Sequence, residues 1–371
     1  MQSTDMTALA AQVLWASFFL STLFGILAQR THFCTMGAVS DIVNIGDWTR
    51  MRQWVLAIGV GMIGFALLSF SGQIDPTKII YASNRFIWLS ALVGGGLFGF
   101  GMVLASGCGS KTLVRIGGGS LKSLIVFIVL GVSSFATLKG ITAVLRVNTV
   151  DQIAIDIDVG TLLPQLISDI FDIKSAWIGL VAGCLIGSAL VVWALWRSDF
   201  RRVENLLAGL GIGGIVVAMW WVTGSLGFVA EHPDTLQEVF LATSSGKAES
   251  LSFVAPVAYS LDWLMFFSDK NKLLTTGVVS VAGVVMGSWV QAIWQKSFRW
   301  EGFGGTEDVA NHLTGATLMG IGGVTAMGCT VGQGLSGVST LSLVSFVSVA
   351  GIVFGAVLAL KYQVWRLGGL D

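Results

Sequence analysis

Ten apolar runs, most of them long enough to cross a lipid bilayer as a helix, constrain what this chain can fold into. They lie near residues 9–28, 53–71, 87–106, 121–138, 176–196, 204–222, 251–267, 274–294, 309–328 and 338–360. Lipid offers no hydrogen-bond partners to backbone groups, so only helices or closed barrels can span it. The chain is 54% hydrophobic and 11% charged, against roughly 25% charged residues in a soluble domain. The sequence therefore predicts an all-α polytopic membrane protein with a single membrane domain, 1–371.

Glycine is unusually frequent, with 48 of the 371 residues. In a membrane protein, glycine lets helices approach closely and lets a helix break part-way across the bilayer. Glycine-rich segments follow two of the apolar runs, at 117–119 and 332–337. Irregular backbone at membrane depth is tolerated only where protein or a water-filled cavity satisfies its polar groups. We therefore expect about nine transmembrane helices plus short re-entrant half-helices near these segments.

A signature of glycines and one cysteine occurs twice, with a constant offset of 221 residues between the copies. It comprises Gly99, Gly101, Gly107 and Cys108 in the first copy and Gly320, Gly322, Gly328 and Cys329 in the second. Gly94 and Gly315 are separated by the same offset. Internal repeats in transporters relate two halves that build one site near the middle of the membrane. The repeat thus predicts two pseudo-symmetric halves, each bringing one thiol and closely approaching backbone to that site.

The halves can be placed along the chain from this repeat. Repeat 1 is predicted at about 9–140 and repeat 2 at about 204–360, joined by an external loop and one helix over 141–203. A shorter signature from Gly25 to Cys34 has a weaker counterpart after position 213, where Thr223 takes the place of the cysteine. Parallel and inverted halves both fit the sequence, because the choice depends on the number of spans between them.

Basic residues gather in alternate loops, which predicts an orientation for the chain. The clusters lie at 50–52, 111–122, 197–202 and 270–272. Short loops rich in Lys and Arg are typically cytoplasmic, so the N-terminus, the acidic 139–175 connection and the 224–250 connection would lie outside. Lys361 and Arg366 would also lie outside if all ten runs crossed, so we expect one of the last three runs to be re-entrant.

The four cysteines are far apart in the sequence, and none has a Cys-x-x-Cys or zinc-ligand spacing. We therefore expect neither a metal site nor a bound cofactor. Cys108 and Cys329 are candidate site residues, because the repeat places both at glycine-rich breaks. Cys184 lies in an apolar run, where a cysteine usually acts as a small buried hydrophobic residue, and we expect it to lie away from the site.

Thiols at glycine-rich breaks suit a soft, sulfur-containing anion. A thiol is a weak hydrogen-bond donor with a polarisable sulfur, and turns that lead into helix starts offer free N–H groups and a positive dipole end. Weak donors let an anion bind and leave, whereas strong fixed cations would trap it. Lys111 and Arg115 follow Cys108 at helical spacing and could draw an anion towards the cytoplasm, although a positive-inside role explains them too.

Three motifs in this chain resemble the YeeE/YedE family of membrane proteins. They are Arg30-Thr-His-Phe-Cys34-Thr-Met-Gly37-Ala, Gly101-x5-Gly107-Cys108 and Gly328-Cys329-Thr-x-Gly-Gln-Gly334. The resemblance spans about residues 12–360 and implies about nine transmembrane helices plus short membrane-embedded helices. It also implies uptake of thiosulfate across the inner membrane, with Cys34, Cys108 and Cys329 passing the anion inward through S–H hydrogen bonds to its sulfur.

Further expectations come with the resemblance. It implies a transporter rather than an enzyme, and a small TusA-like cytosolic sulfur-carrier protein as a partner. Backbone support for the site would come from Gly101, Gly107, Gly322 and Gly328. The motif around Cys329 adds Thr330 and Gln333 as candidate contacts. The acidic 139–175 connection is not explained by the resemblance.

Two other functions would use the same residues. A membrane thiol-disulfide oxidoreductase would need two cysteines whose Cα atoms approach to roughly 4.4–6.8 Å, and usually an electron acceptor. In a transporter of a selenium compound or a channel for a formate-like anion, the thiols would be incidental. His32, His312 and Asp262 are ionisable residues near or within apolar runs, and we expect local contacts rather than a role in transport for them.

Overall fold

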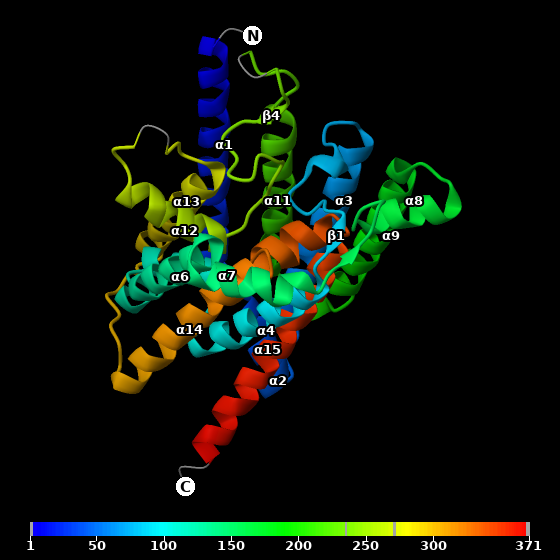
Figure 1. Ribbon diagram of the computed structural model, residues 1–371. Coiled ribbons are helices and arrows are strands. Elements are labelled where there is room, and N and C mark those ends of the chain that lie inside the picture. Colours follow the sequence, from blue (N-terminus) through cyan, green and yellow to red (C-terminus); the bar gives the residue numbers. More distant parts are fainter. Residues whose placement is uncertain (1–2, 234–235, 270–271, 369–371) are drawn as a thin grey trace.

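Helices make up most of the computed structural model, which describes residues 3–233, 236–269 and 272–368 (Figure 1). The first part contains α1 (Ser3–Arg30), α2 (Thr35–Ile45), α3 (Thr49–Phe70), η1 (Pro76–Lys78), α4 (Trp88–Leu104), α5 (Gly109–Gly117) and α6 (Leu121–Lys139). The middle contains α7 (Ile141–Asn148), η2 (Val150–Gln152), α8 (Leu163–Phe171), α9 (Ser175–Leu195) and η3 (Ser198–Phe200).

The last part of the chain repeats the alternation of long and short helices. Its elements are α10 (Val203–Leu206), η4 (Leu207–Gly211), α11 (Ile212–Trp221), η5 (Val222–Leu226), α12 (Val254–Met265), α13 (Thr276–Trp294), α14 (Thr306–Thr325), η6 (Gly332–Gly337) and α15 (Leu343–Gly368). Two short antiparallel ribbons pair β1 (Arg85–Phe86) with β2 (Ile155–Asp156) and β3 (Phe228–Val229) with β4 (Val239–Phe240).

Eight helical segments of the described residues are long and apolar enough to cross a membrane. They are Met6–Ile45, Thr49–Phe70, Trp88–Gly117, Leu121–Lys139, Ser175–Leu195, Val203–Leu226, Thr276–Trp294 and Leu343–Arg366. α14 has 20 residues, about 30 Å of helix at 1.5 Å per residue, but Glu307, Asp308 and His312 occupy its first two turns. The prediction of an all-α polytopic membrane protein is confirmed.

The two glycine signatures meet where α4 crosses α14 in the middle of the bundle (Figure 1). A Cβ atom added at Gly94 would lie 2.7 Å from the carbonyl oxygen of Gly322, and one at Gly322 would lie 2.6 Å from that of Gly94. Gly101 and Gly315 oppose each other in the same way, at 2.6 Å in both directions. Residues with a side chain would force the helices apart, so glycine is what allows this close crossing.

These contacts are reciprocal across the sequence repeat. Gly94 touches Gly322, and their repeat equivalents, Gly315 and Gly101, touch each other. Such an exchange of contacts is what a two-fold axis produces. α4 and α14 run in opposite directions, so the axis lies perpendicular to both helices and the two copies are inverted. At this crossing the two signatures are in the inverted orientation, one of the two that the sequence left open, and the bounds of the halves, about 9–140 and 204–360, stay a prediction.

The connections between helices divide between two sides of the bundle. On the side of the N-terminus, Ile79 pairs with Ala248 and β1 pairs with β2, which joins the 224–250 and 139–175 connections to the segment between α3 and α4. On the other side, Ser120 pairs with Glu301, and α15 ends there (Figure 1). We call these the N-terminal side and the C-terminal side.

The apolar run at 251–267 does not cross the bundle. α12 has 12 residues, about 18 Å of helix, against a hydrocarbon core of about 30 Å. It ends on the N-terminal side, where α13 begins and runs parallel to α1 (Figure 1). We predicted that the basic cluster at 270–272 lies on the same side as the other basic clusters, and this is wrong for Lys272. Lys270 lies outside the described residues. The run that does not cross is therefore 251–267 and not, as we expected, one of the last three apolar runs. Lys361 consequently lies on the C-terminal side.

Candidate functional site

Three cysteines, Cys34, Cys108 and Cys329, share one backbone geometry. Each follows a long helix that ends in a tight turn, and the residue two positions before each cysteine has a positive φ angle. These residues are His32 (φ 53°), Ser106 (φ 55°) and Met327 (φ 58°). The conformation is uncommon for residues other than glycine. The repeated turn therefore unites all three cysteines, including Cys34, which the glycine signature does not cover.

All three turns are closed by the same backbone bond, which in the Cys34 turn runs from the N–H of Phe33 to the carbonyl of Ala28 at 3.2 Å. The N–H of Gly107 donates to the carbonyl of Met102, and the N–H of Gly328 donates to that of Gly323, each at 2.8 Å. This bond spans five residues and belongs to the Schellman turn, which ends a helix and redirects the chain. Because the chain turns sharply there, the next residue, a cysteine, lies at the start of a new helix.

The three sulfur atoms lie at helix starts. Cys34 precedes α2, Cys108 precedes α5, and Cys329 precedes a short helix that begins at residue 330 and contains η6. The Sγ atom of Cys34 accepts the N–H of Gly37 at 3.4 Å, and that of Cys329 accepts the N–H of Gly332 at 3.4 Å. Helix starts carry a partial positive charge and free N–H groups. An anion is therefore favoured beside each thiol.

The thiols form a buried series. Cys34 is 6% exposed, Cys108 is 1% exposed and Cys329 is 0% exposed. Cys108 lies near enough to both of the others for an electrostatic interaction. Its sulfur also lies 3.3 Å from the hydroxyl of Ser110. All three are free thiols, so each can offer its S–H as a donor.

The four glycines proposed as backbone support have two different roles. Gly101 and Gly322 lie in the crossing of α4 and α14, away from the turns. Gly107 and Gly328 lie in the turns themselves. A Cβ atom at Gly107 would lie 3.1 Å from Cγ of Lys111. A Cβ atom at Gly328 would lie 3.1 Å from Cγ of Gln333. The first pair sets the helix spacing, and the second leaves room for neighbouring side chains.

The residues after Cys329 differ in how their polar groups are used. The amide of Gln333 donates to the carbonyl of Ala326 at 2.7 Å and accepts the hydroxyl of Ser345 at 2.6 Å. Gln333 therefore holds the turn before Cys329. The hydroxyl of Thr330 is buried and has no hydrogen-bond partner among the described residues. Thr330 is thus the better placed of the two to contact a substrate.

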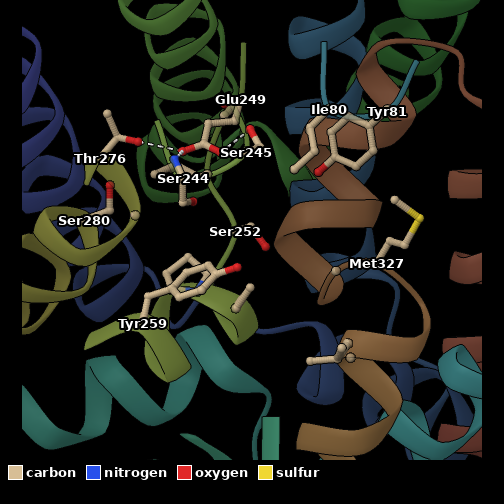
Figure 2. Close-up of a pocket in the computed structure, with 18 of the residues that line it drawn as sticks. Ile80, Tyr81, Ser244, Ser245, Glu249, Ser252, Tyr259, Thr276, Ser280 and Met327 are labelled. Carbon is tan, nitrogen blue, oxygen red and sulfur yellow. Dashed lines mark hydrogen bonds between the residues drawn. The ribbon is translucent and has the colours of Figure 1, made fainter. Parts of the chain in front are cut away.

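A cavity of about 260 Å³ opens on the N-terminal side beside the Cys329 turn. Its lining includes Met327 and Gly328 of that turn, with Tyr81, Glu249 and Tyr259 around it (Figure 2). The phenol of Tyr81 donates to the carbonyl of Gly332 at 2.5 Å, which ties the cavity wall to the short helix after Cys329. The cavity therefore lies beside the turn that carries Cys329.

Glu249 is the acidic group of this cavity and lies in the connection before α12. Its carboxylate accepts the hydroxyls of Thr276 at 2.7 Å and Ser245 at 2.9 Å (Figure 2). Burial raises the pKa of Glu249 above its ordinary value, and these hydrogen bonds oppose the rise. A carboxyl group that takes up a proton more readily carries less negative charge, which favours an anion in the cavity.

Basic side chains lie on the other side of the thiols. Lys111 interacts electrostatically with Cys34 and Cys108, and also with Arg115 and Arg50. The structure therefore brings together Lys111, Arg115 and two of the cysteines. The cavity thus lies beside the Cys329 turn, and the basic side chains lie near Cys108 and Cys34.

Other residues that the sequence singled out have local contacts. Cys184 lies on α9, which packs against α3 at the edge of the bundle. Nδ1 of His312 lies 2.9 Å from Asp308, and Asp262 forms an ion pair with Lys272. Within 3–233, 236–269 and 272–368, no group of three or more His, Cys, Asp or Glu side chains could hold a metal ion.

Sequence comparisons identify the group of proteins to which this geometry belongs. The family model described as Sulphur transport matches residues 30–358, a range that includes the three cysteines and both glycine signatures. The chain belongs to the sulphur transport family. This membership confirms the resemblance seen in the three motifs. It makes the chain a membrane transport protein and not an enzyme.

Within the sulphur transport family, two proteins named thiosulfate transporter TsuA are similar to this chain over most of its length. The TsuA of Spirochaeta thermophila is 25% identical over 350 residues, which cover 92% of this chain and 97% of the relative. The TsuA of Escherichia coli is 26% identical over 343 residues, or 90% of each chain. The probable transporter YedE of Escherichia coli is 30% identical over 110 residues, which cover 30% of this chain and 26% of YedE.

The cavity residues were not found by sequence reasoning. Glu249 lies in a connection that the sequence assigned to an external loop, and Tyr81 lies between two apolar runs. The available signal was the position of Glu249 two residues before the apolar run at 251–267, which places a carboxylate at the edge of the membrane region. Nothing in the local sequence indicates that these segments meet beside Cys329.

Proposed function

We propose that this sulphur transport protein imports thiosulfate, or a closely related sulfur oxyanion, across the bacterial inner membrane. The observation that carries the proposal is the series of three buried thiols at helix starts, with a cavity at one end and basic groups at the other. Two relatives named thiosulfate transporters cover at least 90% of the chain. Because most basic clusters lie on the C-terminal side, that side would be cytoplasmic and the N-terminus would lie outside.

In the proposed path, the anion enters the cavity and meets the Cys329 turn first. It then passes Cys108 and Cys34 and leaves beside Lys111. Each thiol donates its S–H to the terminal sulfur of thiosulfate, while helix N–H groups favour the negative charge. These donors are weak, so the anion is released from each in turn. The thiols are almost inaccessible to solvent, so passage requires the turns to open transiently.

The proposal includes a cytosolic acceptor on the C-terminal side. A small TusA-like sulfur-carrier protein would receive the thiosulfate as it leaves the region of Lys111 and Arg115. Consumption of the anion there would keep its cytosolic concentration low and favour net import.

Competition in a purified system tests the substrate. Proteoliposomes that contain only this protein should take up labelled thiosulfate, and unlabelled thiosulfate should compete at least about tenfold better than sulfate, a difference of ~1.4 kcal/mol. Sulfate lacks the terminal sulfur that a thiol would recognise. Equal competition by selenite or formate would contradict thiosulfate as the substrate.

Uptake is expected to fall as the external pH rises through the raised pKa of Glu249. Below that pKa the carboxyl group is neutral, and above it the carboxylate repels an anion in the cavity. Tyr81, Tyr259 and Arg146 are the other ionisable groups that line the cavity. Glu249→Gln should therefore keep uptake high and flatten its pH profile.

Glu238→Gln is the matched control for this pH dependence. Glu238 lies in the same connection but pairs with Lys78 at 2.6 Å, and it does not belong to the cavity lining. Its replacement should leave the pH profile unchanged. Identical pH profiles for Glu249→Gln and the wild-type protein would show that Glu249 does not control access to the cavity.

A further inference from the structure

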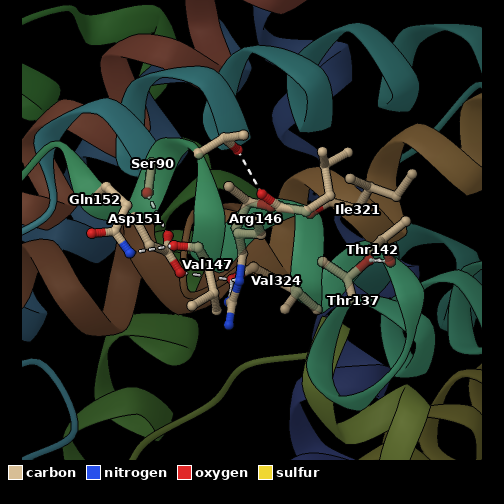
Figure 3. Close-up of polar contacts among 12 residues, drawn as sticks. Ser90, Thr137, Thr142, Arg146, Val147, Asp151, Gln152, Ile321 and Val324 are labelled. Atoms are coloured by element: carbon tan, nitrogen blue, oxygen red, sulfur yellow. Dashed lines mark hydrogen bonds and ion pairs between the residues drawn. The ribbon is translucent and has the colours of Figure 1, made fainter.

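The helix α7 lies in the acidic connection and has two different faces. Ile141, Val144 and Leu145 are exposed on one face, at 84%, 62% and 64% of their surface. On the opposite face, Arg146 lines the cavity and Thr142 lies 2.9 Å from another hydroxyl, that of Thr137 (Figure 3). Such a helix suits the boundary between membrane and water. α7 therefore holds a guanidinium group at the N-terminal side of the cavity.

The guanidinium group of Arg146 makes two contacts with the protein (Figure 3). Its Nε atom lies 3.2 Å from a carboxylate oxygen of Asp151, and a terminal nitrogen donates to the carbonyl of Val324 at 3.5 Å. Asp151 is itself anchored to α4, because the hydroxyl of Ser90 donates to its other oxygen at 2.6 Å. A guanidinium has five N–H donors, so Arg146 keeps donors for a ligand in the cavity.

Val324 connects Arg146 to the turn that carries Cys329. The carbonyl of Val324 also accepts the N–H of Met327 at 3.0 Å, and Met327 is the residue with positive φ before the cysteine. The connection that supplies Arg146 lies between the two repeats. The guanidinium of Arg146 therefore contacts the turn before Cys329 and not the equivalent turn before Cys108.

The charges around the cavity favour this position for an anion. Arg146 is the one cation among the described residues of its lining. The other ionisable lining residues are Glu249, Tyr81 and Tyr259, and Glu249 is bonded to hydroxyl groups rather than to Arg146. An incoming anion thus meets a single guanidinium whose charge is balanced by one carboxylate, that of Asp151.

We propose that Arg146 is the anion-capture residue of the cavity and binds the oxygens of the incoming oxyanion in exchange for its contact with Asp151. This assignment rests on the proposed function and adds a binding site ahead of the thiols. A planar guanidinium can donate two parallel hydrogen bonds to an oxyanion. The competing carboxylate keeps binding weak enough for release. Through Val324, capture takes place next to the turn of Cys329.

Transport kinetics in proteoliposomes test this assignment. Arg146→Gln should raise the KM for thiosulfate about tenfold or more, ~1.4 kcal/mol, with a maximal rate close to that of the wild-type protein. Asp151→Asn should lower the KM, because it removes the group that competes with the anion. Arg85→Gln is the matched control, since Arg85 donates to the backbone carbonyl of Asp151 at 2.8 Å but does not line the cavity.

The possible outcomes distinguish anion capture by Arg146 from a purely structural role of this residue. An unchanged KM for Arg146→Gln, equal to that of Arg85→Gln, would overturn it. A rise in KM for both Arg146→Gln and Asp151→Asn would show that the ion pair only braces α7, which would overturn it too. If Arg146→Gln does not fold, the sign of the change in Asp151→Asn decides, because Arg146 is then intact. Failure of the wild-type protein to take up thiosulfate would instead contradict the proposed function, and this assignment with it.

Discussion

Cys108→Ala and Cys329→Ala are each expected to reduce thiosulfate uptake to near background while folded protein stays in the membrane. A hydrogen bond to a charged group contributes about 1.5–3 kcal/mol, so the loss of one donor from the path should slow passage roughly ten- to 150-fold. Both side chains are almost fully buried at the start of a helix, so solvent cannot readily replace the missing donor. Initial rates of uptake, normalised to the amount of folded protein, measure the effect.

The same substitution at Cys184 provides the control for these variants. Cys184 lies on α9 at the edge of the bundle and is only partly buried. Cys184→Ala should transport at a rate close to that of the wild-type protein, because a change of this size in a partly exposed site costs little. Normal uptake by Cys108→Ala and Cys329→Ala, or an inactive Cys184→Ala, would show that the transport path lies elsewhere.

Gly322→Ala is expected to prevent the correct packing of α4 against α14. The added Cβ atom would lie 2.6 Å from the carbonyl oxygen of Gly94 and would also meet the backbone nitrogen of Phe98. Both atoms belong to the backbone, so the two helices would have to separate. Overpacking of this kind costs about 1–3 kcal/mol. The melting temperature and the yield of folded protein should both fall.

Gly96→Ala is the matched control for helix packing. Gly96 lies in α4 as well, but a Cβ atom there would meet nothing within 4 Å. This variant should fold and melt like the wild-type protein. If Gly322→Ala were equally stable, the crossing of the two signatures would not hold the bundle together.

Most of the fold could be predicted from hydropathy, because a bilayer-spanning helix must be long and apolar. The runs at 53–71 and 176–196 correspond closely to α3 and α9. The run at 251–267 was misleading, because apolar composition does not measure depth. Residues 254–262 of α12 are mostly buried against neighbouring helices, and the 12 residues of this helix are too few to cross.

The repeat predicted a meeting of two glycine signatures but not its direction. The inverted relation appears only in the contacts, where Gly94 meets Gly322 and Gly101 meets Gly315. A sequence offset alone cannot distinguish parallel from inverted halves. The count of spans that would decide was uncertain, because α12 and the helices broken at Cys108 and Cys329 resemble spans in composition.

The candidate site could be predicted only in part. The repeat pointed to Cys108 and Cys329, and the family motif added Cys34. The turn that precedes all three cysteines could not be predicted from the sequence, because its residues with positive φ, such as His32 and Met327, are not glycines. Arg146 and Glu249 could not have been assigned to one cavity, since their meeting depends on long-range packing of two connections.

A membrane thiol-disulfide oxidoreductase would use the same cysteines in a different chemical reaction. It requires a disulfide to form and break during each cycle, with electrons passed to an acceptor. Simple passage of the anion requires neither, and it leaves the bond between the two sulfur atoms of thiosulfate intact. The chemical form of the sulfur that arrives inside therefore distinguishes the two mechanisms.

Analysis of the transported product is the decisive measurement. Thiosulfate labelled in its terminal sulfur is supplied to proteoliposomes that contain this protein alone, and the sulfur species in the lumen are then identified. Passage along the three thiols predicts intact labelled thiosulfate inside, which should appear roughly ten- to 150-fold more slowly with Cys108→Ala. Labelled sulfur retained on the protein, sulfite without thiosulfate in the lumen, or equal uptake by Cys108→Ala would contradict a path of hydrogen-bonding thiols.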